Sequence, residues 1–379
     1  MHTGGVSKSM SSLMNVIDRQ RYDVSLMIMN PEGALMSLLP PDLRIISDPA
    51  RSALNSRLRG AATLLKLGRP FLAAAHCARL CVSLFNKPLA GRIIAKLMPP
   101  LDEEFDTIVD FNGQQQLYYM VDKLRAKKKI SFFHSDYRKW PYYYSADKIY
   151  FPKVDSIWTI SDVCVQSLRD YFPEVADRIR LMENISSSEL IARMAADGDA
   201  PEIDGNVPSI LTIGHVCDSK GAHWAIEAAG ILKKSGVNFK WYFLGANPNQ
   251  THYEDMCKAH DVVDRIQFLG IRTNPYPYIK KATIIAHPSQ FEGRSIALDE
   301  TKLLHKPVVV TNFSTVGDQF THGHNATICE MNAESIAGAV RELLTDESLR
   351  EKYTATLAAE AQDNTSEINK LYEIFDREN

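Results

Sequence analysis

The chain has 379 residues, a formal net charge of −3 and 45% hydrophobic residues. This length is more than one hydrophobic core usually supports and predicts two α/β domains, while the composition excludes a disordered chain. No zinc spacing is present among the six cysteines. Since no signal peptide and no uncharged apolar run of about 18 residues is visible, we expect a cytoplasmic protein without a transmembrane helix.

A glycine pair opens the chain, because Gly4 and Gly5 precede a helical segment and a strand over residues 24–29. Such a turn is typical of a nucleotide-binding domain, in which a strand normally leads into it. Since no strand precedes it here, we expect Met1 to be an internal methionine of a slightly longer gene product. Further strand-like runs alternate with helical segments, as in a doubly wound sheet, at residues 43–47, 107–111, 130–134 and 156–161.

Residues 51–98 form a basic region with nine Lys and Arg residues and no Asp or Glu. Leu, Phe, Ala and Ile stand between these charges, which predicts a helical insertion that contacts an anionic membrane surface. A helical hairpin with merely solvated charges is the alternative, and no motif supports nucleic acid. Cys77 and Cys81 are four residues apart in this region, and we expect them to pack in an apolar helix.

A Gly-, Pro- and Asp-rich stretch over residues 196–207 predicts an interdomain linker. It separates a first domain, residues 1–195, from a second domain, residues 208–364. A final helix over residues 365–379 is expected to cross back onto the first domain. Asp197 and Asp199 have a D-x-D spacing inside the stretch, and we interpret them as loop residues rather than metal ligands.

The second domain begins with a strand, a glycine turn and a helix that starts near Gly221. A second strand ends at Gly245. A helix N-terminus at the carboxyl end of a parallel strand presents free amides and a positive dipole end, so this turn is a natural seat for phosphate.

Residues 284–312 hold the most informative pattern. Two short β-branched runs, residues 283–286 and 308–311, suit strands that are covered on both faces. Between them lie a loop with Glu292 and Gly293 and a helix over residues 295–304. Ser295 is expected to cap this helix with its side chain. Glu292 and Glu300 have seven residues between them; if most of these steps are helical, the carboxylates lie about 10 Å apart at ~1.5 Å per residue.

This E-x7-E pattern, in its strand-loop-helix-strand setting, resembles the signature of family 4 retaining glycosyltransferases. The resemblance implies the GT-B fold, in which two Rossmann-like, doubly wound domains face a central cleft. It further implies that Glu292 lies beside the donor sugar and phosphates and that Glu300 holds the ribose hydroxyls. Gly4 and Gly5 would approach the donor phosphates or the acceptor. His134, at the end of a predicted strand, would reach the donor sugar and the acceptor.

The family places an arginine and a lysine beside the donor diphosphate in place of a metal ion. Lys220 matches the lysine, but His215 stands at the arginine position, and a histidine is mostly neutral at pH 7. We therefore predict that Arg294 supplies the second charge. The diphosphate would lie across Lys220, Arg294 and the amides of residues 294–296, which include Ser295 and Ile296. Gly221, Gly245 and Gly293 would allow the close backbone approach, and no cofactor or metal is expected.

The resemblance implies transfer of a hexose with retention, from a UDP-sugar or, less favoured, a GDP-sugar. Together with the basic region it predicts a lipid-linked or surface-polysaccharide acceptor, as in lipopolysaccharide or capsule synthesis. The enzyme would then be peripheral on the inner face of the plasma membrane. The alternatives are a soluble acceptor, a GT-B epimerase or phosphorylase, and a catalytically silent GT-B subunit that binds a donor or a partner.

Overall fold

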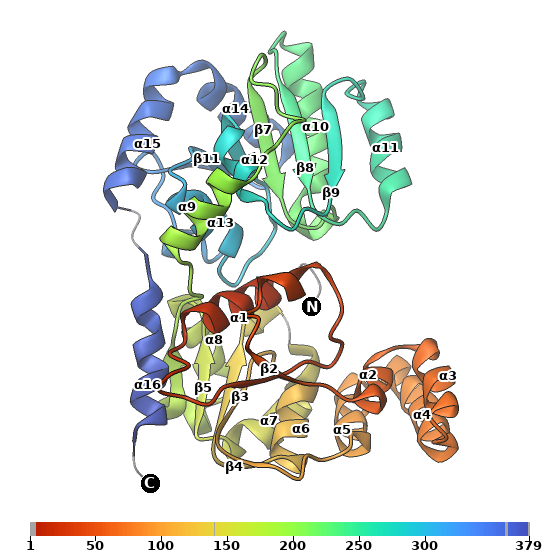
Figure 1. Cartoon of the computed structure of the whole chain (residues 1–379). Coiled ribbons are helices and arrows are strands. Elements are labelled where there is room, and N and C mark those ends of the chain that lie inside the picture. The colour runs from red at the N-terminus through yellow and green to blue at the C-terminus, as the bar shows by residue number, and fades with distance from the viewer. Residues whose placement is uncertain (1–4, 140, 361–362, 378–379) are drawn as a thin grey trace. The chain divides into compact units, whose positions relative to one another are not determined.

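A computed structural model describes residues 5–139, 141–360 and 363–377. The chain divides into two compact units, each with parallel β-structure and helices (Figure 1). Residues 13–183 and the last helix form the N-terminal unit. Residues 5–12 and 184–366 form the C-terminal unit, which therefore includes the predicted linker and most of the first helix.

The N-terminal unit contains two parallel sheets. One pairs β1 with β2, and the other has the order β3-β4-β5-β6. Each predicted strand of this unit is present, although the described residues show no ladder that joins the two sheets into one. The strands are β1 (Ser25–Met27), β2 (Arg44–Ile46), β3 (Glu104–Asp110), β4 (Arg125–Phe133), β5 (Ser156–Thr159) and β6 (Ile179–Leu181).

The predicted insertion consists of four helices between β2 and β3, which stand out to one side in Figure 1. They are α2 (Pro49–Asn55), α3 (Leu58–Lys66), α4 (Pro70–Phe85) and α5 (Lys87–Leu97). Asp48 caps α2 and Asn86 caps α5, each through a side-chain oxygen that accepts a hydrogen bond from a first-turn amide. The Asp48 cap therefore marks the start of the insertion, and the Asn86 cap separates α4 from α5.

The other helices of this unit are α6 (Gln115–Lys123), α7 (Tyr144–Tyr150), α8 (Asp162–Tyr171) and α16 (Asn369–Phe375). Helix α16 comes from the end of the chain and packs on the N-terminal unit. Its Tyr372 hydroxyl accepts a hydrogen bond from the Asp18 amide at 2.7 Å, and its ring stacks on Tyr22 with centroids 5.1 Å apart.

The C-terminal unit holds one six-stranded parallel sheet in the order β12-β11-β10-β7-β8-β9. Its strand order reverses between β7 and β10, and ligands of such sheets bind outside the carboxyl ends of the strands at this point. The two β-branched runs form β10 and β11 as predicted. The strands are β7 (Ser209–Ile213), β8 (Lys240–Leu244), β9 (Ile266–Gly270), β10 (Ile284–His287), β11 (Val308–Thr311) and β12 (Thr327–Cys329).

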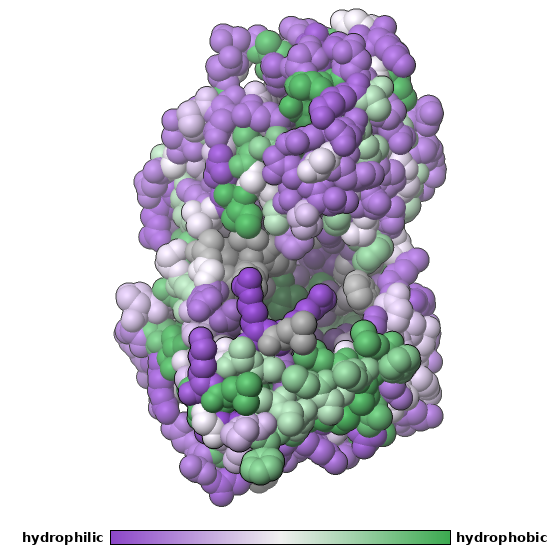
Figure 2. Space-filling view, turned by 90° about the vertical axis from the view of Figure 1, so that its right-hand side faces the viewer, coloured by the Kyte–Doolittle hydropathy of each residue, from purple (hydrophilic) through white to green (hydrophobic). Residues whose placement is uncertain are grey.

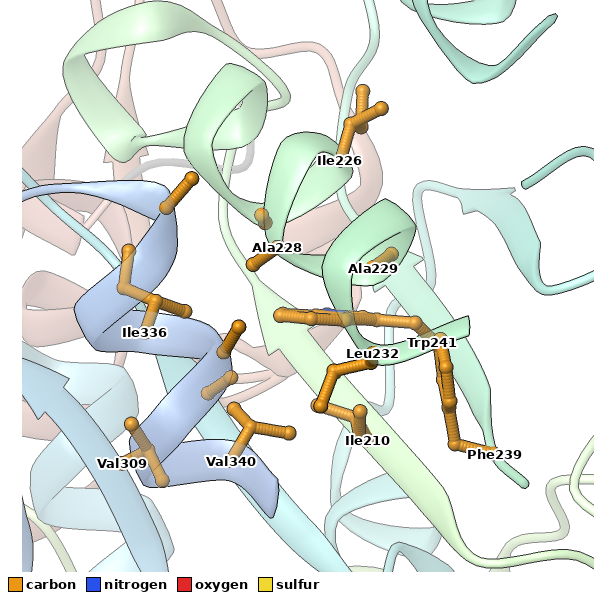
Figure 3. Close-up of a cluster of buried hydrophobic side chains, with 14 of the residues drawn as sticks. Ile210, Ile226, Ala228, Ala229, Leu232, Phe239, Trp241, Val309, Ile336 and Val340 are labelled. Carbon is orange, nitrogen blue, oxygen red and sulfur yellow. The ribbon is translucent and has the colours of Figure 1, made fainter. Parts of the chain in front are cut away.

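Helices cover this sheet and bury its apolar strands. Figure 3 shows Trp241 of β8 beside Leu232 of α10, with Ile336 and Val340 of α14 close to Val309 of β11. All of these side chains are buried. The helices assigned to this unit or starting in it are α1 (Gly5–Val16), α9 (Ser188–Asp197), α10 (Ala222–Lys234), α11 (Gln250–Ala259), α12 (Tyr276–Lys281), α13 (Ile296–Leu303), α14 (Ala333–Thr345) and α15 (Glu347–Glu360).

Candidate functional site

The turn after β7 and the loop after β10 meet because these strands are neighbours in the sheet. Gly221 makes the contact possible. Its φ is +69°, and a Cβ atom at this position would lie 1.9 Å from the carbonyl oxygen of Pro288. Only glycine meets both conditions without strain. The close approach places Lys220 within hydrogen-bond distance of Glu292, so these two residues lie side by side as predicted.

Glu292 accepts several hydrogen bonds through a single oxygen. Its Oε1 lies 2.5 Å from Lys220 Nζ, 2.8 Å from Ser289 Oγ and 2.9 Å from His287 Nε2. Burial acts to raise the pKa of Glu292, but the Lys220 charge and the His287 contact outweigh it and lower the pKa to about 2. Among the described residues, none donates a hydrogen bond to Oε2. Glu292 is thus an anion with one oxygen anchored and one available.

The low pKa of Glu292 predicts a loss of stability in acid. A carboxyl group whose folded pKa is below its unfolded value of 4.5 stabilises the fold above pH 4.5 and loses this contribution as the pH falls toward 2. The full contribution is on the order of 3 kcal/mol. We expect Glu292→Gln to lower the free energy of unfolding at pH 7, and the difference from the unaltered chain to shrink between pH 5.5 and pH 3. Denaturant titrations at several pH values measure it, and a difference independent of pH would contradict the ion pair.

Glu300 is buried, with 3% of the residue exposed. Both of its carboxylate oxygens lie 2.7 Å from Lys8 Nζ, and Oε1 also accepts a hydrogen bond from the Tyr276 hydroxyl at 2.8 Å. Burial and the Glu300 charge raise the pKa of Tyr276 well above its usual value, so this hydroxyl remains a donor. The sequence analysis predicted neither Lys8 nor Tyr276 as a partner of Glu300.

Arg294 forms a bidentate ion pair with Asp299 rather than standing open to a ligand. The Nε and Nη2 atoms lie 2.9 and 3.1 Å from the two carboxylate oxygens, and both side chains are 9% exposed. The predicted side-chain cap by Ser295 is wrong, since its side chain makes no cap bond. Gln319 replaces it, accepting from the Ser295 amide at 3.0 Å and donating to Asp299 at 2.9 Å. A diphosphate contact of Arg294 stays a prediction.

Helix α13 begins at Ile296, so only the last part of the path from Glu292 to Glu300 is helical. The predicted separation of the two carboxylates assumed that most of these steps are helical, and the structure does not meet this assumption. Gly5, the first residue of α1, lies beside Ile296, because a Cβ atom on this glycine would be 3.9 Å from Ile296 Cδ1. The first turn of α1 thus lies close to the start of α13.

The other residues predicted to bind the donor differ in how exposed they are and in what they contact. Gly245 approaches the turn after β7 so closely that a Cβ atom would lie 1.9 Å from the carbonyl oxygen of Gly214. His215 is exposed and Gly293 is buried. Gly4 lies outside the described residues.

His134 follows β4 in the N-terminal unit and is partly buried. Its ring packs against Phe111, with centroids 4.6 Å apart, and against Phe132 at 5.7 Å. These contacts hold the imidazole at the carboxyl end of the strand. Its catalytic role stays a prediction.

The described residues contain no cluster of three or more His, Cys, Asp or Glu side chains that could hold a metal ion. Asp199, from the D-x-D spacing, instead accepts a hydrogen bond from Lys281 at 2.9 Å.

Helices α3 and α4 carry an exposed surface that is both basic and apolar. Phe71 and Phe85 are each 91% exposed and Leu84 is 77% exposed. Figure 2 faces this side and shows apolar residues gathered over the N-terminal unit. Arg51 is buried, and Arg79 donates to the carbonyl oxygen of Leu54 at 3.2 Å. Six of the nine basic residues are exposed: Arg57, Arg59, Lys66, Arg69, Lys87 and Lys96.

Cys77 and Cys81 are both exposed, so the prediction that they are packing residues of an apolar helix is wrong. The reason is that α4 buries only a narrow stripe, including Ala73 and His76, and leaves the rest of its apolar surface open. Among the described helices, none combines the length and apolar content needed to span a bilayer.

The fold and this site define a two-domain α/β protein with the GT-B architecture and a pair of largely buried carboxylates at the switch point of its six-stranded sheet. Residues 196–357 match the glycosyl transferases group 1 family. This match lies within the C-terminal unit and is consistent with the expected resemblance to family 4.

Three known proteins illustrate the similarity. The lipopolysaccharide core biosynthesis glycosyltransferase LpsD of Rhizobium meliloti is 24% identical over 224 residues, 56% of this chain and 64% of that protein. The N-acetylgalactosamine-N,N'-diacetylbacillosaminyl-diphospho-undecaprenol 4-alpha-N-acetylgalactosaminyltransferase of Campylobacter jejuni is 25% identical over 205 residues, 54% of each. The structure of Anabaena Alr3699/HepE with UDP and glucose superposes with a TM-score of 0.70 at 13% identity, covering 98% of this chain and 95% of that one.

Proposed function

We propose that this protein transfers a hexose, with retention of configuration, from a nucleotide-diphosphate sugar to a lipid-linked or surface-polysaccharide acceptor. A UDP-sugar is favoured over a GDP-sugar, because the HepE structures of the same fold hold UDP, UDP and glucose, or UDP-glucose. Two relatives support the acceptor class, since one is named for lipopolysaccharide core synthesis and the other for an undecaprenol-linked glycan.

The observation that carries this proposal is the pair of largely buried carboxylates, each held by a lysine, at the carboxyl edge of a parallel sheet. Lys220 would pair with the donor diphosphate and stabilise the charge that develops on the leaving nucleotide. The open Oε2 of Glu292 would accept a hydroxyl of the donor sugar. Glu300 would accept the ribose hydroxyls, and His134 would position the donor. We assign neither a protein nucleophile nor a metal.

We further propose that the α3–α4 surface holds the enzyme on an anionic membrane, at the inner face of the plasma membrane. Exposed Lys and Arg residues near such a surface contribute about 1 kcal/mol each. The exposed rings of Phe71 and Phe85 would enter the membrane–water interface, between these basic side chains. This location brings the active site to a lipid-linked acceptor.

Ligand-induced stabilisation tests the donor class. The melting temperature should rise with UDP or GDP, and more with the nucleotide that binds more tightly, because a ligand that binds only the folded chain stabilises it by mass action. Glu300→Gln should reduce nucleotide affinity at least about tenfold, since a charge-assisted hydrogen bond to ribose is lost. The control is Glu254→Gln, an exposed glutamate on α11. Binding unaffected by Glu300→Gln would overturn the assigned site. Binding with no turnover on any lipid-linked glycan would favour a silent subunit.

A further inference from the structure

Lys8 connects the first helix of the chain to one of the two site carboxylates. Its ammonium lies 2.7 Å from each oxygen of Glu300 and 5.3 Å from the centre of the Tyr276 ring. The Lys8 side chain is 22% exposed, whereas the Glu300 side chain is 4% exposed. The lysine therefore lies at the solvent side of the carboxylate and covers it.

The hydrogen-bond capacity of Glu300 conflicts with a ribose diol while Lys8 stays in place. A carboxylate has about four lone-pair positions. Lys8 occupies one on each oxygen, and Tyr276 occupies the second on Oε1. Only one position on Oε2 remains, and two ribose hydroxyls need two. A nucleotide that binds Glu300 through both hydroxyls has to displace the ammonium from at least one oxygen.

A displaced ammonium needs another anion, and the nucleotide itself carries one. Of the two basic residues expected at the diphosphate, Arg294 is held by Asp299 through two hydrogen bonds, and Lys220 is shared with Glu292. His215, at the position expected to carry an arginine, provides no permanent charge. Of the two residues expected to face the diphosphate, only Lys220 would then supply a cation, and a second cation would strengthen the binding of a nucleoside diphosphate.

We propose that Lys8 exchanges partners when a nucleotide binds: it releases Glu300 to the ribose diol and pairs with the diphosphate. This inference rests on the proposed function, since it requires a nucleotide at Glu300. Lys8 then has two effects of opposite sign. It competes with the ribose of every nucleoside, and it attracts only those ligands that carry phosphate.

Titration calorimetry with uridine, UMP and UDP, and with the guanosine series in parallel, tests the exchange. In Lys8→Met we expect uridine to bind at least as tightly as in the unaltered chain, while UDP affinity falls about tenfold. The ratio of the uridine Kd to the UDP Kd should fall by at least this factor, and the salt dependence of UDP binding should weaken. Lys280→Met, an exposed lysine on α12, is the control and should leave the ratio unchanged.

An unchanged ratio in Lys8→Met would overturn the proposal, whether the affinities fall together or rise together. Lys8→Arg keeps the charge and should keep most of the ratio. If Lys8→Met fails to fold because Glu300 is left without a cation, the Lys8→Met/Glu300→Gln variant removes both charges. Its ratio should be below that of Glu300→Gln, and equal ratios would also overturn the exchange. Absence of nucleotide binding in the unaltered chain would instead refute the proposed function.

Discussion

Replacing Lys220 by methionine should lower kcat/KM for glycosyl transfer by about 100- to 1,000-fold, the effect typical of removing one preorganised donor from a developing charge. Two losses combine here. The leaving diphosphate would lose the cation proposed to bind it, and the Glu292 side chain, which is only 12% exposed, would keep its negative charge without that partner. Steady-state kinetics with the donor that gives the largest thermal shift measures the effect.

The matched control is Lys258→Met, because this lysine is exposed and pairs with Asp255 on the surface of α11. Such surface pairs contribute little, so its kinetics should match those of the unaltered enzyme. Adding His215→Arg to Lys220→Met places a permanent charge on the same turn and should recover part of the loss. If Lys220→Met retains more than about half of the activity, the diphosphate does not bind where we propose.

Replacing both Phe71 and Phe85 by serine should weaken binding to anionic vesicles about 100-fold. Each ring is 91% exposed in the chain and would leave water on contact with lipid. Burial of one such side chain contributes at least about 1.5 kcal/mol, so two contribute enough for two orders of magnitude. Flotation with vesicles of phosphatidylglycerol and phosphatidylcholine measures the bound fraction.

Charge reversal at Arg57 and Arg59 should also weaken vesicle binding, and the remaining binding should depend less on salt. Val263→Ser is the control, because this residue is 62% exposed but belongs to the C-terminal unit. Equal binding of all variants would contradict a membrane role for α3 and α4. If the enzyme does not bind vesicles and transfers sugar efficiently to a soluble glycan, the soluble-acceptor alternative is favoured.

The positions of the strands and of Glu292, Gly221 and Lys220 could be predicted because they depend on local pattern. Uncharged β-branched runs such as β11 suit only a strand that is covered on both faces. The glycine turn after β7 and the loop after β10 meet because strand order puts both at one sheet edge. Expectations failed where a local pattern allowed several partners, as for the cap at Ser295 and the apolar residues of α4.

Two α/β units, a switch-point loop and helix that carry one glutamate each, and a basic insertion without acidic residues could all be predicted from the sequence. The partner that each charge takes depends on the tertiary structure. Lys8 is 292 positions from Glu300, and Gln319 is 24 positions from Ser295. Any lysine could pair with any nearby carboxylate, so the choice depends on which elements pack together. This is why Arg294 pairs with Asp299 while Lys8 covers Glu300.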